Sequence, residues 1–98
     1  VVRAGDLLFV SGKLGTDSAG RLVPGGIGPE TRQVMRNIEA SLARAGSSMD
    51  RVVKCTAFLV DLAEWPAMNR EYVPFSPARG RRGRGRARVE IECVALAR

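Results

Sequence analysis

The apolar residues of the chain fall into short runs that are separated by glycine, proline and small polar residues. Residues 7–10, with the sequence LLFV, lie between a Gly-Asp and a Ser-Gly turn signal, and this pattern predicts a short β-strand. Together with the apolar residues 1–3 before the turn, the strand predicts a β-hairpin. Residues 12–28 are rich in glycine, serine, aspartate and proline, which predicts a long loop with a strand fragment at residues 21–23.

The next two stretches differ in the period of their apolar residues. In residues 31–45 the apolar positions recur at helical spacing, which predicts an amphipathic helix with Pro29 at its start and Gly46 just after its end. Residues 51–60, with the sequence RVVKCTAFLV, carry apolar residues on both alternating faces, as expected of a strand in the middle of a sheet.

Another helix and another strand follow. Asp61 and Glu64 have the spacing of a capping box, which predicts a second helix that two downstream prolines end. Residues 89–97 predict a final strand with one apolar face and a second face that begins with Glu90 and Glu92. The order hairpin, helix, strand, helix, strand predicts an α+β fold with two helices on one face of a β-sheet.

The composition agrees with this picture, because 98 residues with 45% hydrophobic content suffice for a single domain with a modest core. The net charge of +6 is local: six of the sixteen Lys and Arg residues lie between Arg79 and Arg88, and the rest of the chain carries ten basic and ten acidic residues. The charge therefore does not make the whole domain resemble a nucleic-acid-binding protein.

The residue types argue against several kinds of site. The chain has no histidine and two widely spaced cysteines, Cys55 and Cys93, so a zinc site is not expected. Because each cysteine lies in an apolar run, we expect two buried free thiols, with a disulfide as the alternative. No stretch approaches the length of a membrane span and no signal peptide is visible, so a cytoplasmic location is the expectation.

Several short motifs occur along nearly the whole chain: LFVSG at residues 8–12, LVPGG at 22–26, TRQ at 31–33, AGSS at 45–48, VVKCT at 52–56, MNREY at 68–72, PAR at 77–79 and VEIE at 89–92. Each motif is weak alone. Together, and in this order, they resemble the RidA/YjgF family of reactive enamine/imine deaminases, also called the L-PSP endoribonuclease family.

This resemblance implies a chorismate-mutase-like α+β fold that assembles as a homotrimer, with clefts between the subunits. It also implies a hydrolase that deaminates 2-enamine and 2-imino acids, such as 2-aminoacrylate and 2-iminopropanoate, to 2-keto acids and ammonia. No metal or organic cofactor is implied.

The resemblance assigns roles to four residues. Arg79 matches the arginine that binds the substrate carboxylate, and a guanidinium has the geometry that fits a carboxylate. Glu90 matches the acidic residue near the attacked carbon, where a carboxylate can orient the attacking water or carry its proton. Asn69 and Ser11 match residues of the substrate cleft. Ordinary structural roles stay open for all four, and Glu92 is expected to be exposed or structural.

The chain departs from the family pattern at three places. It begins after the short N-terminal segment whose aromatic residue helps to close the cleft, and it has Lys13 where the family usually has glutamine, which adds a charge near the expected cleft. Residues 80–87, with the sequence GRRGRGRA, replace an apolar strand, and alternating glycine and arginine form a poor strand core. A poorly held Arg79 would impair activity, because such a site depends on preorganisation.

Two alternatives to an enzyme stay open. One is a trimer that binds a small carboxylate without turnover, which Lys13 and the missing aromatic residue favour. The other is an RNA-binding or endoribonuclease-like protein that contacts phosphates through the arginines from Arg79 to Arg88. Against the second alternative, no aromatic side chain for base stacking lies inside this tract.

Overall fold

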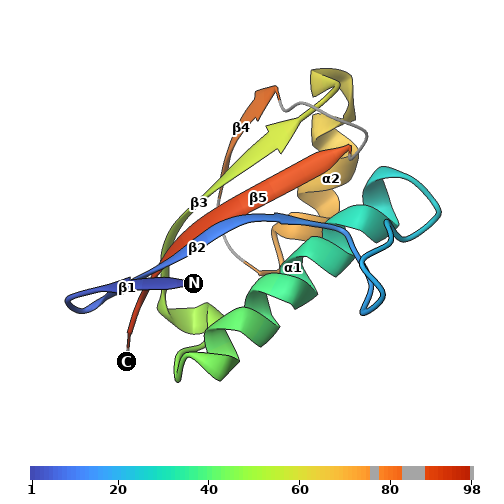
Figure 1. The fold of residues 1–98 in the computed structure, drawn as a ribbon. Helices are drawn as coiled ribbons and strands as arrows, with labels where there is room; N and C mark the ends of the chain where they lie inside the picture. Colours follow the sequence, from blue (N-terminus) through green and yellow to red (C-terminus); the bar gives the residue numbers. More distant parts are fainter. Residues whose placement is uncertain (76–77, 83–87, 98) are drawn as a thin grey trace.

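Figure 1 shows the fold in a computed structural model that describes residues 1–75, 78–82 and 88–97, of which residues 78–82 are described by their backbone alone. A twisted β-sheet forms one layer, and two helices pack together over one of its faces (Figure 1). This two-layer arrangement confirms the α+β fold with both helices on one face of the sheet.

The sheet consists of β1 (Val2–Ala4), β2 (Leu7–Leu14), β3 (Val52–Leu59), β4 (Ala78–Arg82) and β5 (Val89–Leu96). Their order across the sheet is β1-β2-β5-β3-β4. β3 and β4 run parallel to each other, and the other paired strands are antiparallel. The last strand of the chain therefore lies in the middle of the sheet, where it pairs with both β2 and β3 (Figure 1).

The helix layer consists of α1 (Ile27–Arg44) and α2 (Trp65–Tyr72), with short 3₁₀ turns η1 (Met49–Arg51) and η2 (Leu62–Glu64) beside them. α1 begins earlier than predicted, because two glycines with positive φ turn the chain into the helix and Gly26 accepts the first helical hydrogen bond from Glu30 at 3.1 Å. The predicted capping box is present only in part: the Asp61 side chain accepts from the backbone N–H of Ala63 at 2.9 Å and caps η2, whereas the Glu64 carboxylate accepts from Arg88.

The core lies between the sheet and the helices. The alternation predicted for the final strand is confirmed: Val89, Ile91 and Cys93 are buried, whereas Glu90 is half-buried and Glu92 is exposed. The inner faces of α1 and α2 complete the core with Val34, Met35, Ile38, Leu42, Met68 and Tyr72. No helix in the described ranges is long and apolar enough to cross a bilayer.

The first part of the glycine-arginine stretch corrects the sequence interpretation. The backbone of β4 pairs with β3 residue by residue, from Cys55 opposite Ala78 to Leu59 opposite Arg82. Strand pairing uses backbone N–H and C=O groups, which arginine and glycine supply as well as other residues do, and β4 lies at the edge of the sheet. Residues 83–87 lie outside the described part of the chain.

The two cysteines also correct the sequence interpretation, because Cys55 and Cys93 form a disulfide and are not free thiols. They lie directly opposite each other on β3 and β5, with their Cα atoms 4.1 Å apart. Residues that face each other in an antiparallel pair have Cα atoms about 4.5 to 5.5 Å apart, which is within the reach of a disulfide. The separation of 38 residues along the chain gave no indication of it.

Candidate functional site

The strand β2 is irregular where it passes β5. Its register against β5 shifts between Val10 and Lys13, so that Ser11 and Gly12 together face a single residue of β5. β2 therefore continues to Leu14 and does not end at the Ser-Gly signal. A β-bulge of this kind re-aims the side chains around it. Ser11 lines a hollow on the exposed face of the sheet, and Lys13 lines a pocket on the helix-covered face.

The carboxylate of Glu90 lies directly against the backbone of Gly12. Glu90 pairs with Leu14 beyond the bulge, and a Cβ built on Gly12 would lie 2.2 Å from Glu90 Oε1. Real Cβ atoms essentially never approach another atom more closely than 3.0 Å, so the carboxylate takes this place because residue 12 is glycine. The motifs LFVSG and VEIE thus meet here, and we take Ser11, Gly12 and Glu90 as the described part of the candidate active site.

The backbone of Arg79 lies in register with this part of the sheet. Arg79 pairs with Thr56 of β3, and Thr56 pairs in turn with Glu92 of β5. Glu92 lies opposite the bulge of β2 that contains Ser11, so these residues form one row across the sheet, perpendicular to the strands. The side chain of Arg79 lies outside the described residues, so its predicted contact with a substrate carboxylate stays a prediction.

A hollow of about 290 Å³ follows this row on the exposed face of the sheet. It is lined by Val2, Phe9, Val10, Ser11, Lys54, Thr56, Glu92, Cys93 and Val94. Glu92 therefore lies beside Ser11 in a hollow with charged and hydroxyl groups. Sequence motifs did not indicate Lys54 and Thr56, although their alternation within VVKCT places both on the same face of β3. The described residues contain no cluster of three or more His, Cys, Asp or Glu side chains that could hold a metal ion.

Asn69 lies in the other layer of the molecule. It belongs to α2, which Figure 1 shows in the helix layer, and the neighbouring residues Met68 and Tyr72 are fully buried in the core. Within one chain, the sheet lies between α2 and the face that carries Ser11 and Glu92. Of the four predicted site residues, the structure brings Ser11 and Glu90 together through the bulge and does not bring Asn69 to them.

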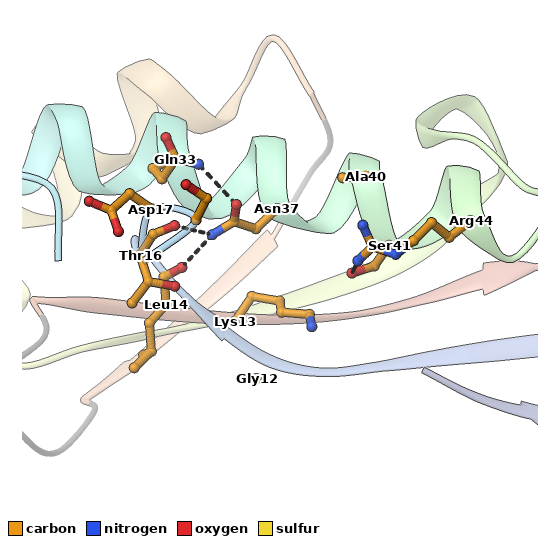
Figure 2. Close-up of a pocket in the computed structure, with 11 residues that line it drawn as sticks. Gly12, Lys13, Leu14, Thr16, Asp17, Gln33, Asn37, Ala40, Ser41 and Arg44 are labelled. Carbon is orange, nitrogen blue, oxygen red and sulfur yellow. Dashed lines mark hydrogen bonds between the residues drawn. The ribbon is translucent and has the colours of Figure 1, made fainter. Parts of the chain in front are cut away.

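A second and larger pocket of about 500 Å³ lies between β2, the loop after it and α1 (Figure 2). Lys13 lines this pocket together with Asn37 and Arg44 of α1. The sequence analysis expects the charge of Lys13 near the cleft with Ser11. Because of the bulge, the structure instead places Lys13 on the opposite face of the sheet.

Arg88, the last arginine of the tract, binds carboxylates of the protein itself. Its backbone N–H donates to Glu30 Oε1 at 3.2 Å, and its Nη1 donates to the two carboxylate oxygens of Glu64 at 3.2 and 3.0 Å. Glu30 is a buried residue of α1, and Glu64 belongs to η2. Arg88, just before β5, therefore connects the start of β5 to both of these elements. The side chains of the other arginines between Arg79 and Arg88, and with them the predicted RNA contact, lie outside the described residues.

Comparisons with known proteins match the chain over most of its length. The family model named Endoribonuclease L-PSP matches residues 1–97. The mouse 2-iminobutanoate/2-iminopropanoate deaminase is 36% identical over 101 residues, which covers 91% of this chain and 73% of that protein. Protein mmf2, mitochondrial, of Schizosaccharomyces pombe is 35% identical over 105 residues and covers 96% of this chain and 82% of that protein. A RutC family protein of Pyrococcus horikoshii is 39% identical over 75 residues, or 76% of this chain, and the match spans 60% of that relative's length.

Solved structures agree with these relatives. RidA from an Antarctic Psychrobacter species superposes with a TM-score of 0.86 at 29% identity, covering 97% of this chain and 84% of that one. A putative endoribonuclease of Thermotoga maritima superposes with a TM-score of 0.86 at 30% identity, covering 97% of this chain and 82% of that one. These likenesses confirm the chorismate-mutase-like fold that the motifs imply. The chain therefore belongs to the RidA/YjgF family, the family whose model carries the name Endoribonuclease L-PSP.

Proposed function

We propose that this protein hydrolyses reactive 2-enamine and 2-imino acids, such as 2-aminoacrylate and 2-iminopropanoate, to 2-keto acids and ammonia. The observation that carries the proposal is the position of the Glu90 carboxylate against Gly12, the residue that follows Ser11 in the bulge of β2. Three residues from two distant motifs of an imine deaminase family meet at one point of the sheet. The mouse relative that carries the name of this activity supports the same choice.

The proposed reaction adds water to a C=N bond. The water oxygen attacks C2 of the imino acid, and Glu90 accepts a proton from that water. The same carboxyl group then returns the proton to the nitrogen, which gives a carbinolamine with a hydroxyl and an amino group on C2. Glu90 next accepts the hydroxyl proton and passes it to the nitrogen, so that the C2–N bond breaks, ammonia leaves and the C2–O bond becomes the carbonyl of the 2-keto acid. Arg79 binds the substrate carboxylate, because a guanidinium matches a carboxylate with two parallel hydrogen bonds. Ser11 donates a hydrogen bond to the bound substrate.

The proposed site needs more than one subunit. Asn69, which matches a cleft residue of the family, lies in the helix layer of the same chain that presents Ser11 on its opposite face. The exposed face of the sheet carries apolar side chains such as Phe9, which is 42% exposed, and Leu96, which is 45% exposed. We propose that this face packs against two further copies in a homotrimer, and that the clefts between the copies hold the substrate.

The test is the rate of ammonia formation from freshly generated 2-iminopropanoate, measured as the increase over spontaneous hydrolysis. Glu90→Gln keeps the size of the side chain and removes its basicity, so kcat/KM should fall by about 10² to 10⁴-fold. Arg79→Ala should abolish turnover, because the carboxylate loses its cationic partner.

The matched control is Arg36→Ala, because Arg36 is an exposed arginine of α1 outside the site. This variant should retain the full rate. Unchanged turnover in both Glu90→Gln and Arg79→Ala would contradict the site assignment. Binding of pyruvate by the unmodified protein without acceleration of ammonia release would instead support a carboxylate-binding protein.

A further inference from the structure

We propose that the pocket between β2 and α1 binds a phosphate monoester through Lys13 and Arg44. This pocket has a volume of about 500 Å³, within the range of small-molecule sites. It lies on the helix-covered face of the sheet, whereas Ser11 lines the hollow on the other face, and the two sites adjoin at Gly12, which also lines this pocket. The binding inferred here does not depend on the proposed deaminase activity.

Two cationic side chains meet at one end of the pocket. Figure 2 shows the side chain of Lys13 extending from β2 toward Ser41 and Arg44 on the last turns of α1. Within the described part of the chain, neither cation forms an ion pair, and Arg44 uses a single N–H to donate to Ser41 Oγ at 3.2 Å. Arginine has five such donors and lysine has three, so most of the charged donors at this end are available to a ligand.

Hydrogen bonds between the lining residues hold one wall of the pocket in place. Asn37 Nδ2 donates to the backbone carbonyls of Leu14 and Thr16 at 3.0 and 2.9 Å, and Asn37 Oδ1 accepts from Gln33 Nε2 at 2.9 Å (Figure 2). These bonds attach the end of β2 to α1. A pocket that is held open in this way binds a ligand without first having to order its own side chains.

The acidic group of the pocket lies at the opposite end. Figure 2 shows Asp17 beside Gln33, away from Ser41 and Arg44. Its Oδ1 accepts from the backbone N–H groups of Ala19 and Arg21 at 2.9 and 3.1 Å, so the carboxylate stabilises the turn that starts at Asp17. The cationic end is therefore open to an anion, and the hydroxyl-rich end suits a polar tail with hydroxyl groups.

The charge at the cationic end selects among anions. Lys13 and Arg44 repel each other unless an anion lies between them, and together they carry a charge of about +2. A phosphate monoester carries about −1.5 to −2 near neutral pH and offers three acceptor oxygens, whereas a carboxylate carries one negative charge and offers two. Arginine and lysine side by side are also a usual donor set for phosphate.

The bulge in β2 is what directs Lys13 into this pocket. The register shift between Val10 and Lys13 leaves Ser11 on one face of the sheet and turns Lys13 to the other. The one irregularity of the strand thus supplies a residue to each of the two sites.

The experiment is a titration of the ¹⁵N-labelled protein with inorganic phosphate and with glucose 6-phosphate at low ionic strength, followed by backbone amide shifts. Binding should shift the amides of Lys13, Ser41 and Arg44. Glucose 6-phosphate should also shift the amides near Thr16 and Ser18, which line the other end. Lys13→Gln and Arg44→Gln should each raise Kd by about tenfold or more, because a charged hydrogen bond is lost.

Three controls decide the outcome. Arg36→Gln, the same substitution on an exposed arginine of α1 outside the pocket, should leave Kd unchanged. Acetate and glucose should bind much more weakly than glucose 6-phosphate. The proposal is overturned if Lys13→Gln and Arg44→Gln, each shown to be folded by its amide spectrum, bind phosphate as the unmodified protein does. It is equally overturned if acetate binds as well as phosphate, or if the shifts map to another surface.

Discussion

At the level of single residues, the absence of a side chain on Gly12 determines where the Glu90 carboxylate lies. Gly12 has no positive φ, so a larger residue is excluded by space and not by backbone conformation. The three atoms nearest to such a Cβ all belong to the Glu90 side chain, whose far end can move. A substitution here should therefore displace the carboxylate and leave the fold intact.

Gly12→Ala tests this argument. The added Cβ would lie 2.2 Å from Glu90 Oε1 in its present position, so the carboxylate must shift by roughly an ångström to restore an ordinary contact. Misplacement of a catalytic group by about 1 Å can cost about 10²-fold in rate. We expect kcat/KM for 2-iminopropanoate to fall by about that factor, with little change in thermal stability.

Gly28→Ala is the matched control for Gly12→Ala. Gly28 lies in α1, and a Cβ there would meet nothing closer than Arg32 Nη1 at 4.0 Å. Alanine in a helix is favoured over glycine by up to about 1 kcal/mol, so this variant should be slightly more stable and fully active. Equal activity of the two variants would mean that the position of Glu90 does not matter for turnover.

The residues of the candidate site could be predicted from the sequence to different degrees. The motifs indicated Ser11 and Glu90, which lie on neighbouring strands on either side of Gly12, and their roles stay predictions. They could not indicate the bulge, because it depends on the register of β2 against a strand from the other end of the chain. For the same reason the sequence did not indicate that Lys13 and Ser11 lie on opposite faces of the sheet.

At the level of elements, the disulfide between Cys55 and Cys93 joins β3 to β5 at the centre of the sheet. It lies on the core face, since these two residues are only 4% and 2% exposed. The glutamates of β5 point to the other face, so the bonded sulfur atoms and the Glu90 carboxylate lie on opposite faces of the strand.

Reduction of this disulfide should lower the free energy of unfolding. A bond across 38 residues restricts the unfolded chain enough to stabilise the fold by about 4 kcal/mol. Urea denaturation with and without a thiol reductant measures the difference. A Cys55→Ala, Cys93→Ala double variant should match the reduced protein and be indifferent to reductant. Two free thiols found by titration of the denatured, unreduced protein would contradict the bond.

The sequence predicted most elements because their local signals agree with the fold. The period of the apolar residues indicated α1, β3 and β5, and capping residues located the start of the second helical segment at Asp61. β4 was missed because the sequence of Ala78–Arg82 has neither apolar alternation nor β-branched residues. Its strand conformation comes from the neighbouring β3, which sequence patterns do not contain.

At the level of the whole molecule, the two faces of the sheet differ. Helices cover one face, whereas the other carries exposed apolar residues, among them Val2, Phe9 and Leu96, with exposed fractions of 67%, 42% and 45%. A monomer would leave this apolar surface in water. Burial of such a surface favours association, and in the proposed trimer it also creates the clefts.

Phe9→Glu tests the proposed assembly and its connection to activity. Phe9 lies on the exposed face of β2 between Val2 of β1 and Val94 of β5, where a carboxylate can stay hydrated in the monomer but not between subunits. The variant should therefore fold, sediment as a monomer and lose deamination together with the clefts. Leu62→Glu is the control, because Leu62 is 48% exposed in η2, beside the helix layer, and should preserve both the trimer and the rate. Sedimentation velocity and ammonia release on the same samples measure both properties. A fully active Phe9→Glu monomer would show that one chain holds a complete site, and a Phe9→Glu trimer would show that the subunits meet elsewhere.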